Sequence, residues 1–226
     1  MARALICTTL LLSGCGFPRD VGTTLDDVRG GVLKVGITDN PPWTSVPDRG
    51  AEAELVRRLA ERTGSTVEWY PGSESALMAA LKDRVLDLVV GGLEADAPWI
   101  EKAALTRPYV TMRTVIAAAG PVPDDLTGVR VGVRGGTADV AAVAAKGATV
   151  AAYPEISGKE GIPVAVGEWR VDALGLTESG HDVGEADHVW AVPPGENAWQ
   201  TEVERFLLDL SHEQVTDLLV AAEELP

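Results

Sequence analysis

Hydrophobic and polar positions alternate in two distinct patterns from residue 32 onward. Short apolar runs of the β type are separated by segments in which apolar residues recur every three or four positions. The expected elements of the first half are strands at residues 32–37, 66–70 and 86–92 and helices at residues 51–62 and 74–84. Strands and helices at this spacing are typical of a parallel α/β sheet with right-handed crossovers. Because ligands of such sheets bind beyond the carboxyl ends of the strands, the pattern predicts a site at loop 38–43 and turn 93–99.

The amino terminus has the pattern of an export signal. Met1-Ala2-Arg3 is a short positive start, residues 4–12 are apolar, and Leu12-Ser13-Gly14-Cys15 ends the run with small residues and a cysteine. The run is too short to cross a bilayer, which takes about 20 apolar residues. Leu-Ser-Gly-Cys resembles the lipobox of bacterial lipoproteins, which implies cleavage before Cys15 and lipidation of its sulfur. An ordinary secretory signal with a chance cysteine is the alternative.

These features divide the amino-terminal region into a signal peptide at residues 1–14 and a polar, lipid-anchored tether at residues 15–30. Cys7 would leave with the signal and Cys15 would be acylated, so we expect neither a disulfide nor a cysteine-based metal site in the mature fold.

Composition and charge narrow the range of partners. The 226 residues are 46% hydrophobic, which is ample for a buried core, and the formal net charge is −15 with a pI near 4.5. Duplex binding relies on clustered Lys and Arg, so we expect no nucleic-acid partner. An acidic surface mildly favours cationic solutes, although acidity also serves solubility alone.

The segment from Asp87 to Trp99, with Thr106-Arg107-Pro108-Tyr109 after it, carries the clearest resemblance to a known family. It resembles the ligand-contacting strand and turn of the family 3 extracellular solute-binding proteins, the amino-acid receptors of ABC importers. In that family a strand opened by Asp leads into a Thr-Pro-Glu-Arg-like turn and a Phe-Ser-x-Pro-Tyr-like end. The register holds here without a gap, but Trp99 stands where the family has the arginine that grips the ligand carboxylate.

The resemblance implies an α/β, two-lobed periplasmic-binding-protein-like fold of type II. Lobe 1 would comprise residues 31–118, lobe 2 residues 119–188, and residues 189–226 would return to lobe 1 and form the carboxyl-terminal helices. The expected elements of this half are a strand at 114–119, a strand leading to a Gly-Thr turn at 126–137, strands at 148–153, 169–174 and 188–192, and helices at 197–210 and 212–224. Lobe closure would hinge near residues 116–120 and 189–193.

Lobe 2 departs from the family pattern and is expected to be reduced. Gly158, Gly161 and Pro163 interrupt the place of a family helix between residues 154 and 168. The chain is also shorter than usual between Glu178 and His188.

On lobe 1, the resemblance and the residue chemistry together suggest an aromatic and acidic pocket. The family stacks an aromatic residue on its ligand after a Pro-Pro pair, and Trp43 occupies that place; a packed loop tryptophan is the alternative. Glu94 ends the third strand and faces the cleft, whereas Asp96 is either a site residue or a helix N-cap. With Trp99, which cannot donate a two-pronged hydrogen bond to a carboxylate, these residues suit a cation.

On lobe 2, a site of the opposite polarity is the alternative. Arg134, beside the glycine and hydroxyl of Gly136 and Thr137, is placed to hold an anion in a backbone nest, with Arg107 as a second guanidinium; plain helix capping and solvated arginines are the competing interpretations. The family's amine-binding aspartate falls near Thr177, a hydroxyl that cannot neutralise an ammonium. The neighbouring Glu178 is its candidate replacement.

The function that these features indicate is a membrane-anchored receptor on the extracytoplasmic face, which binds a small polar, cationic or amino-acid-like molecule. An ABC permease is the partner that the resemblance implies, and we expect a monomer. Two alternatives stay open: an orphan sensing or accessory lipoprotein, and a dehydratase-type enzyme. His181-Asp182 and Asp187-His188 are pairs that could serve as base and orienting group, but no motif places a serine or cysteine nucleophile, so we predict no catalytic residues, no cofactor and no metal site.

Overall fold

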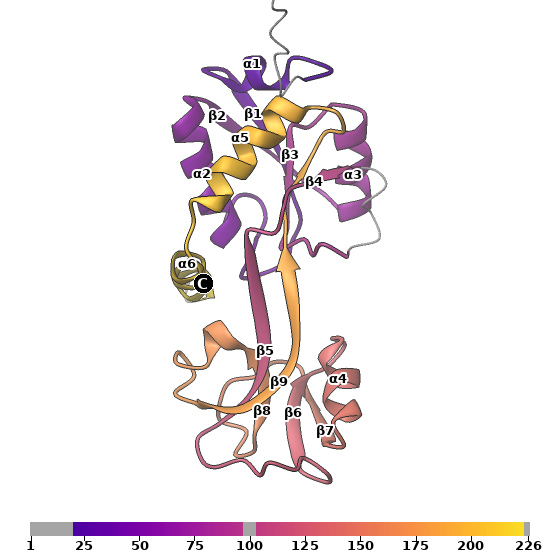
Figure 1. Cartoon of the computed structure of the whole chain (residues 1–226), viewed down its shortest axis with the longest axis vertical. Coiled ribbons are helices and arrows are strands. Elements are labelled where there is room, and N and C mark those ends of the chain that lie inside the picture. The colour runs from indigo at the N-terminus through magenta and orange to yellow at the C-terminus, as the bar shows by residue number, and fades with distance from the viewer. Residues whose placement is uncertain (1–19, 97–102, 224–226) are drawn as a thin grey trace, which may run out of the picture.

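The protein is built from two lobes joined by a narrow waist (Figure 1). The computed structural model describes residues 20–96 and 103–223. Each lobe contains one five-stranded sheet, with the strand order β2-β1-β3-β10-β4 in lobe 1 and β7-β6-β8-β5-β9 in lobe 2. The predicted two-lobed α/β architecture is therefore confirmed.

Lobe 1 follows the expected alternation of strands and helices. Strand β1 pairs in parallel with β2 and β3, while β10 is antiparallel to β3 and β4. The elements are α1 (Thr24–Val28), β1 (Val32–Ile37), α2 (Ala51–Thr63), β2 (Thr66–Pro71), α3 (Glu74–Lys82), β3 (Leu88–Val90), β4 (Ala104–Leu105), β10 (Ala191–Val192), α5 (Asn197–Leu208) and α6 (His212–Glu223).

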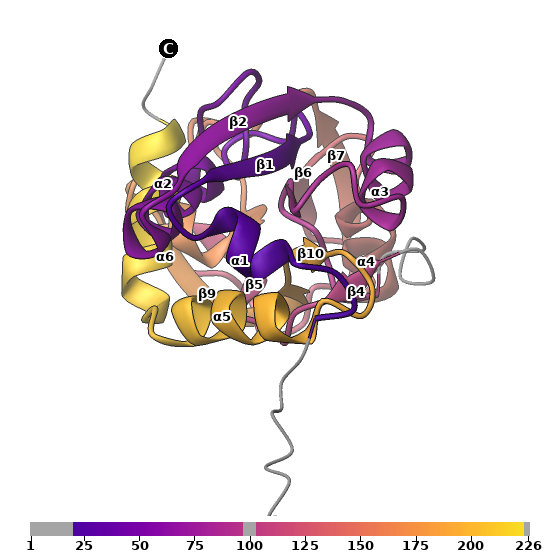
Figure 2. The same cartoon turned by 90° about the horizontal axis from the view of Figure 1, so that it is seen from above.

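The core of lobe 1 lies on both faces of its sheet. Alternate strand residues point to opposite faces, so Val35 and Leu88 pack with α2, α5 and α6, while Val89 packs with α3. Figure 2 shows α2 and α3 on opposite sides of the lobe. Helix α2 ends at Gly64, whose left-handed conformation (φ 68°) lets its N–H reach the carbonyls of the last turn. This packing fixes the carboxyl ends of β1 and β3 at the edge that faces lobe 2.

Lobe 2 is smaller in its helical content. Within the described residues its one α-helix is α4, and the 3-10 helix η2 follows its fourth strand along the chain. The elements are β5 (Val110–Ala118), β6 (Arg130–Arg134), α4 (Asp139–Ala145), β7 (Thr149–Tyr153), β8 (Val164–Gly167), η2 (Glu168–Arg170) and β9 (Thr177–His188).

One predicted strand of lobe 2 is wrong. Residues 169–174 do not form a strand but η2 and a turn, and the strand lies earlier, at β8. The buried run of Val164, Ala165 and Val166 pairs with β5, which a turn containing Arg170 does not do. The region between Glu178 and His188, where the chain is shorter than usual for the family, forms most of the long strand β9, which pairs antiparallel with β5.

Strands β5 and β9 carry the chain between the lobes (Figure 1). Val110 pairs with His188 near lobe 1, and Ala118 pairs with Thr177 at the far end. The first crossing therefore begins before Val110, earlier than the predicted hinge at residues 116–120, because β5 already belongs to the second sheet.

The predicted tether at residues 15–30 is attached to lobe 1 over its described part. Asp20 Oδ1 accepts hydrogen bonds from the first-turn amides of α5, Ala198 N at 2.7 Å and Trp199 N at 3.0 Å. The buried Glu196 carboxylate accepts the N–H of Gly22 at 2.7 Å. These contacts hold the chain from Asp20 onward against lobe 1. Among the described helices, none combines the length and apolar character that crossing a bilayer requires.

Candidate functional site

A cleft of about 750 Å³ lies between the lobes at the carboxyl ends of β1 and β3. Lobe 1 contributes the loop after β1, with Asn40 and Trp43, and the turn after β3, with Gly92 and Glu94. Lobe 2 contributes the ends of β6, β7 and β8, the start of α4 and η2. Both predicted loops of lobe 1 thus face the cleft, as the rule for strand ends requires.

The aromatic wall of the cleft is a stacked pair of Trp43 and His188. Trp43 is 8% exposed, and its ring centroid lies 3.9 Å from that of His188 at an interplanar angle of 30°. Gly92 permits this arrangement: its φ is +65°, and a Cβ there would lie 2.7 Å from Trp43 Cγ. A side chain at position 92 would push the tryptophan out of its place.

Sequence reasoning considered His188 only as a base beside Asp187 and did not place it in the ligand site. It is 5% exposed, and burial lowers its pKa to about 4, against an opposing hydrogen bond to the backbone of Gly92 and the charge of Asp187. Its Nδ1 has no hydrogen-bond partner among the described residues. The imidazole is therefore neutral near pH 7 and presents an uncharged aromatic surface. The sequence signal was its position directly before the apolar run that re-enters lobe 1.

Behind this wall lies the fully buried carboxylate of Glu52, in the first turn of α2. Its Oε2 accepts the N–H groups of Gly91 (2.7 Å) and Gly92 (2.8 Å), which form the cleft turn. Its Oε1 accepts Tyr109 Oη–H (2.8 Å) and Trp190 Nε1–H (3.0 Å), one from each crossing segment. Burial raises the pKa of Glu52, and the four hydrogen bonds oppose that rise. One carboxylate thus ties α2, the cleft turn and both lobe crossings together.

The charge of the cleft is mainly negative. Five carboxylates and two guanidinium groups lie among its described lining residues. Burial raises the pKa of Glu94, and the charges of Asp96, Asp139 and Glu74 raise it further. Burial also raises the pKa of Asp139, which lies across the cleft in α4, while its contact with Thr137 opposes the rise. Both carboxylates would gain from a cation between the lobes, since it would relieve their mutual repulsion.

Of the predicted lobe 2 residues, Arg134 and Thr137 line the cleft and Gly136 does not. Thr137 Oγ1 donates to the Arg134 carbonyl at 2.9 Å and lies 3.4 Å from an oxygen of Asp139. The N–H of Gly135 donates to the Tyr153 carbonyl at 2.8 Å, so it is not available to an anion nest. The helix that follows, α4, has only seven residues. Arg134 itself, at the end of β6, makes no ion pair with any described residue.

Several other candidates lie away from the cleft lining. Asp96 is exposed in the turn after β3, and Thr177 is exposed at the far end of β9. Glu178 lies 3.3 Å from the guanidinium of Arg113, and Arg107 is paired with Glu204 at 3.1 Å. The hypotheses that Glu178 holds a ligand amine and that Arg107 holds a ligand carboxylate are therefore not supported by the geometry. Trp99 and Cys15 lie outside the described residues. No group of three or more metal-ligating side chains occurs within residues 20–96 and 103–223.

Solved structures with the same fold cover most of this chain. The L-cystine solute receptor of Neisseria gonorrhoeae in its unliganded open conformation is 18% identical, with a TM-score of 0.68, over 86% of this chain and 93% of that chain. An ancestral cationic amino-acid solute-binding protein, described as a precursor of cyclohexadienyl dehydratase, is 18% identical with a TM-score of 0.66, over 88% and 98%. A putative ABC-transporter binding component from Wolinella succinogenes, complexed with lysine, is 17% identical with a TM-score of 0.58, over 84% and 94%.

Comparison of the sequence with protein families leads to the same class of proteins as comparison of the fold. No curated protein matches it at a significant level. The family model of the bacterial extracellular solute-binding proteins, family 3, matches residues 33–221, which is nearly the whole of the two lobes. The chain therefore belongs to the family 3 bacterial extracellular solute-binding proteins.

Proposed function

We propose that this protein is a lipid-anchored receptor that captures a small cationic solute, of the basic amino-acid type, between its two lobes. One observation carries the proposal. Glu94 and the stacked rings of Trp43 and His188 line the same side of a mainly acidic cleft. Family membership supports an extracytoplasmic, solute-binding role.

A cation would gain from both kinds of surface. An ammonium or guanidinium over an aromatic ring contributes about 0.5 to 2 kcal/mol, with the larger values where water is excluded. Glu94 and Asp139 face the cleft from opposite lobes, and burial raises the pKa of both carboxyl groups, so a cation between them would favour their ionised forms. For an amino-acid ligand, Arg134 is the guanidinium on lobe 2 that lies free to meet a carboxylate.

Capture would proceed by closure of the lobes about β5 and β9, followed by delivery to an ABC permease. The crossings at Val110 and His188 support a hinge between the lobes. Lipidation of Cys15 would hold lobe 1 close to the membrane from which a permease accepts ligand. Two solved relatives in fold are described as a solute receptor and as an ABC-transporter binding component.

Calorimetric titration with L-lysine, L-arginine, L-glutamine and L-glutamate tests the ligand class. We expect micromolar binding of the two basic amino acids. Glu94→Gln removes a charged hydrogen-bond acceptor and should weaken that binding by at least about tenfold. Glu61→Gln is the matched control, since Glu61 is exposed on α2 away from the cleft. Binding of glutamate alone, or equal affinities in the two variants, would refute a cationic ligand.

The importer role has its own test. Deletion of the gene should lower the uptake of a radiolabelled ligand by whole cells, and restoration with Cys15→Ser, which lacks the lipid anchor, should restore uptake only in part. Unchanged uptake would favour a sensing lipoprotein. The fold relative that preceded a dehydratase also calls for a check of turnover. Recovery of unaltered ligand from the protein, seen by mass spectrometry, is the outcome expected of a receptor.

A further inference from the structure

The two lobes touch at a third place besides strands β5 and β9. Helix α6 belongs to lobe 1, where its Val215 and Leu219 are fully buried in the main core cluster. It lies at the waist, beside the crossing strands (Figure 1). The 3-10 helix η2 of lobe 2 packs against it.

Each of the three residues of η2 contacts lobe 1. Glu168 Oε1 lies 3.5 Å from His212 Nε2 at the start of α6, a contact that is ionic only when the imidazole is protonated. Trp169 packs against the lobe 1 core cluster. Arg170 Nη2 lies 2.6 Å from Glu223 Oε1 at the end of α6. The contact therefore runs along the whole length of α6.

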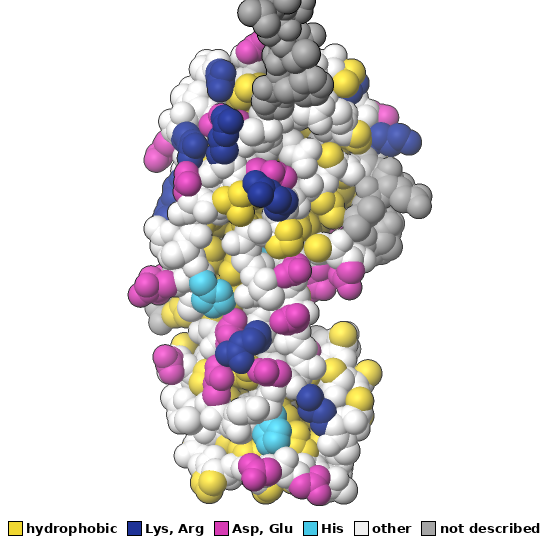
Figure 3. Space-filling model, viewed as in Figure 1, with side chains coloured by type: hydrophobic (Ala, Val, Ile, Leu, Met, Phe, Trp, Pro, Cys, Tyr) yellow, Lys and Arg dark blue, Asp and Glu magenta, His cyan; other side chains and the backbone are white. Residues whose placement is uncertain are grey.

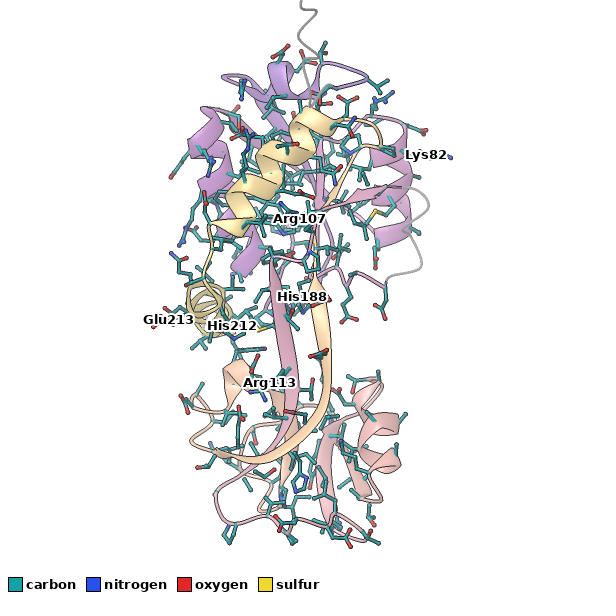
Figure 4. All side chains as sticks on the ribbon, in the orientation of Figure 1. Lys82, Arg107, Arg113, His188, His212 and Glu213 are labelled. Carbon is teal, nitrogen blue, oxygen red and sulfur yellow. The ribbon has the colours of Figure 1, made fainter. Side chains whose placement is uncertain are left out.

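The charged side chains of η2 are held in place by hydrogen bonds within lobe 2. Arg170 Nη2 also donates to the Ile156 carbonyl at 2.9 Å, so its guanidinium is held in lobe 2 whether or not Glu223 is near. Glu168 accepts hydrogen bonds from Arg113 on β5, from its Nε at 2.8 Å and from its backbone N–H at 3.1 Å. Figure 4 shows His212 on α6 above Arg113 on β5. Figure 3 shows basic, acidic and histidine side chains together at the waist.

The same residues border the cleft. Trp169, Arg170 and Glu223 are among its lining, so the contact of η2 with α6 forms one side wall of the space between the lobes. The Arg170 and Glu223 side chains are 16% and 33% exposed, so the pair is partly shielded from solvent and keeps more of its attraction than a fully exposed pair. Among the described residues no backbone hydrogen bond joins η2 to α6, so this wall can open without disrupting either sheet.

We propose that η2 and α6 form an interlobe clasp, with Arg170 as a positioning residue that holds Glu223 across the waist. The clasp holds the two lobes at a fixed distance on one side of the waist, while β5 and β9 act as the hinge on the other side. Exchange of any cleft ligand then requires the clasp to open or slide. The proposal concerns the free protein and does not depend on the identity of the ligand.

The distance between the lobes, measured by pulsed electron paramagnetic resonance, tests the clasp. Spin labels are attached at Glu61→Cys in lobe 1 and Lys159→Cys in lobe 2, both exposed positions, in the full chain with Cys7→Ser and Cys15→Ser. In this background Glu223→Lys places a cation opposite Arg170. Glu213→Lys is the matched control, because Glu213 lies on the same helix (Figure 4) and makes no ion pair with any described residue.

We expect Glu223→Lys to raise the ratio of open to clasped molecules by about fivefold or more, the upper range for a partly exposed ion pair. Arg170→Gln should shift the same ratio in the same direction, and Glu213→Lys should leave the distance distribution unchanged. The midpoint of thermal unfolding should differ little among the three, since Glu223 lies at the end of its helix. Equal distance distributions in Glu223→Lys, Arg170→Gln and Glu213→Lys would overturn the proposal, as would an equal widening in all three.

Discussion

Acidification should lower the free energy of unfolding of this protein through protonation of His188. Burial lowers the pKa of this imidazole from 6.5 to about 4 in the folded protein. The unfolded chain therefore binds a proton that the folded chain refuses between these two values. Stability from His188 is fully present above the unfolded pKa and is lost as the pH falls toward the folded pKa.

The size of the effect follows from the two pKa values. A difference of 2.5 pH units corresponds to about 3 kcal/mol when the loss is complete, below about pH 4. Between about pH 7 and about pH 5 the same relation gives a loss of about 2 kcal/mol. That is a large part of the stability of an ordinary domain, so urea denaturation at a series of pH values will resolve it.

The variant His188→Phe isolates this contribution. Phenylalanine keeps a planar ring against Trp43 and removes both the titration and the unpartnered Nδ1. Carboxyl groups with raised pKa values, Glu52, Asp87, Glu94 and Asp139, titrate in both proteins and act in the opposite direction, so they cancel in the difference. The unfolding free energy of the variant should fall about 2 kcal/mol less than that of the native chain over the same pH interval. Parallel curves for the two proteins would refute a buried, neutral His188.

Two further substitutions test the support behind the cleft. Glu52→Gln replaces a carboxylate that accepts four hydrogen bonds. It should lower the free energy of unfolding, measured in urea, by about 2 to 4 kcal/mol. The control Glu54→Gln, on the solvent side of the same helix, should lower it by less than about 0.5 kcal/mol. Gly92→Ala places a Cβ against Trp43 at a residue with positive φ. It should lower the free energy of unfolding by more than about 1 kcal/mol and alter the tryptophan fluorescence. In the control Gly184→Ala the new Cβ meets no atom within 4 Å, so neither the free energy of unfolding nor the fluorescence should change. Equal costs within either pair would contradict the packing described.

Local patterning was sufficient to predict most of lobe 1. The strand at residues 32–37 was predicted with its observed bounds, and α2 and α3 began where predicted, because each has a periodic apolar face and a clear end signal such as Gly64. The resemblance in the segment that begins at Asp87 then identified the fold, because gap-free register in a buried strand and its turn constrains the surrounding sheet.

Lobe 2 was harder to predict because its strands depend on long-range pairing. Strand β9 contains few apolar residues, and its side chains are mostly exposed or half-buried. Its register comes from pairing with β5, which lies far earlier in the chain, and no local pattern reveals that pairing. The strand was predicted at residues 169–174 on its likeness to the family pattern, although Val164–Gly167 is the run that is buried in the sheet.

The length of β9 also explains why Thr177 lies away from the cleft. The family pattern puts the partner of the ligand amine near Thr177. As an extended strand rising about 3.3 Å per residue, β9 instead places Thr177 roughly 30 Å or more from His188 along its path. The lobe 2 carboxylate that faces Glu94 is therefore Asp139 at the start of α4, brought there by the β6 turn. It follows that Asp139→Asn should weaken binding of L-lysine in the same titration as Glu94→Gln, while Thr177→Ala should not; the reverse order would restore the family's usual position for the amine partner.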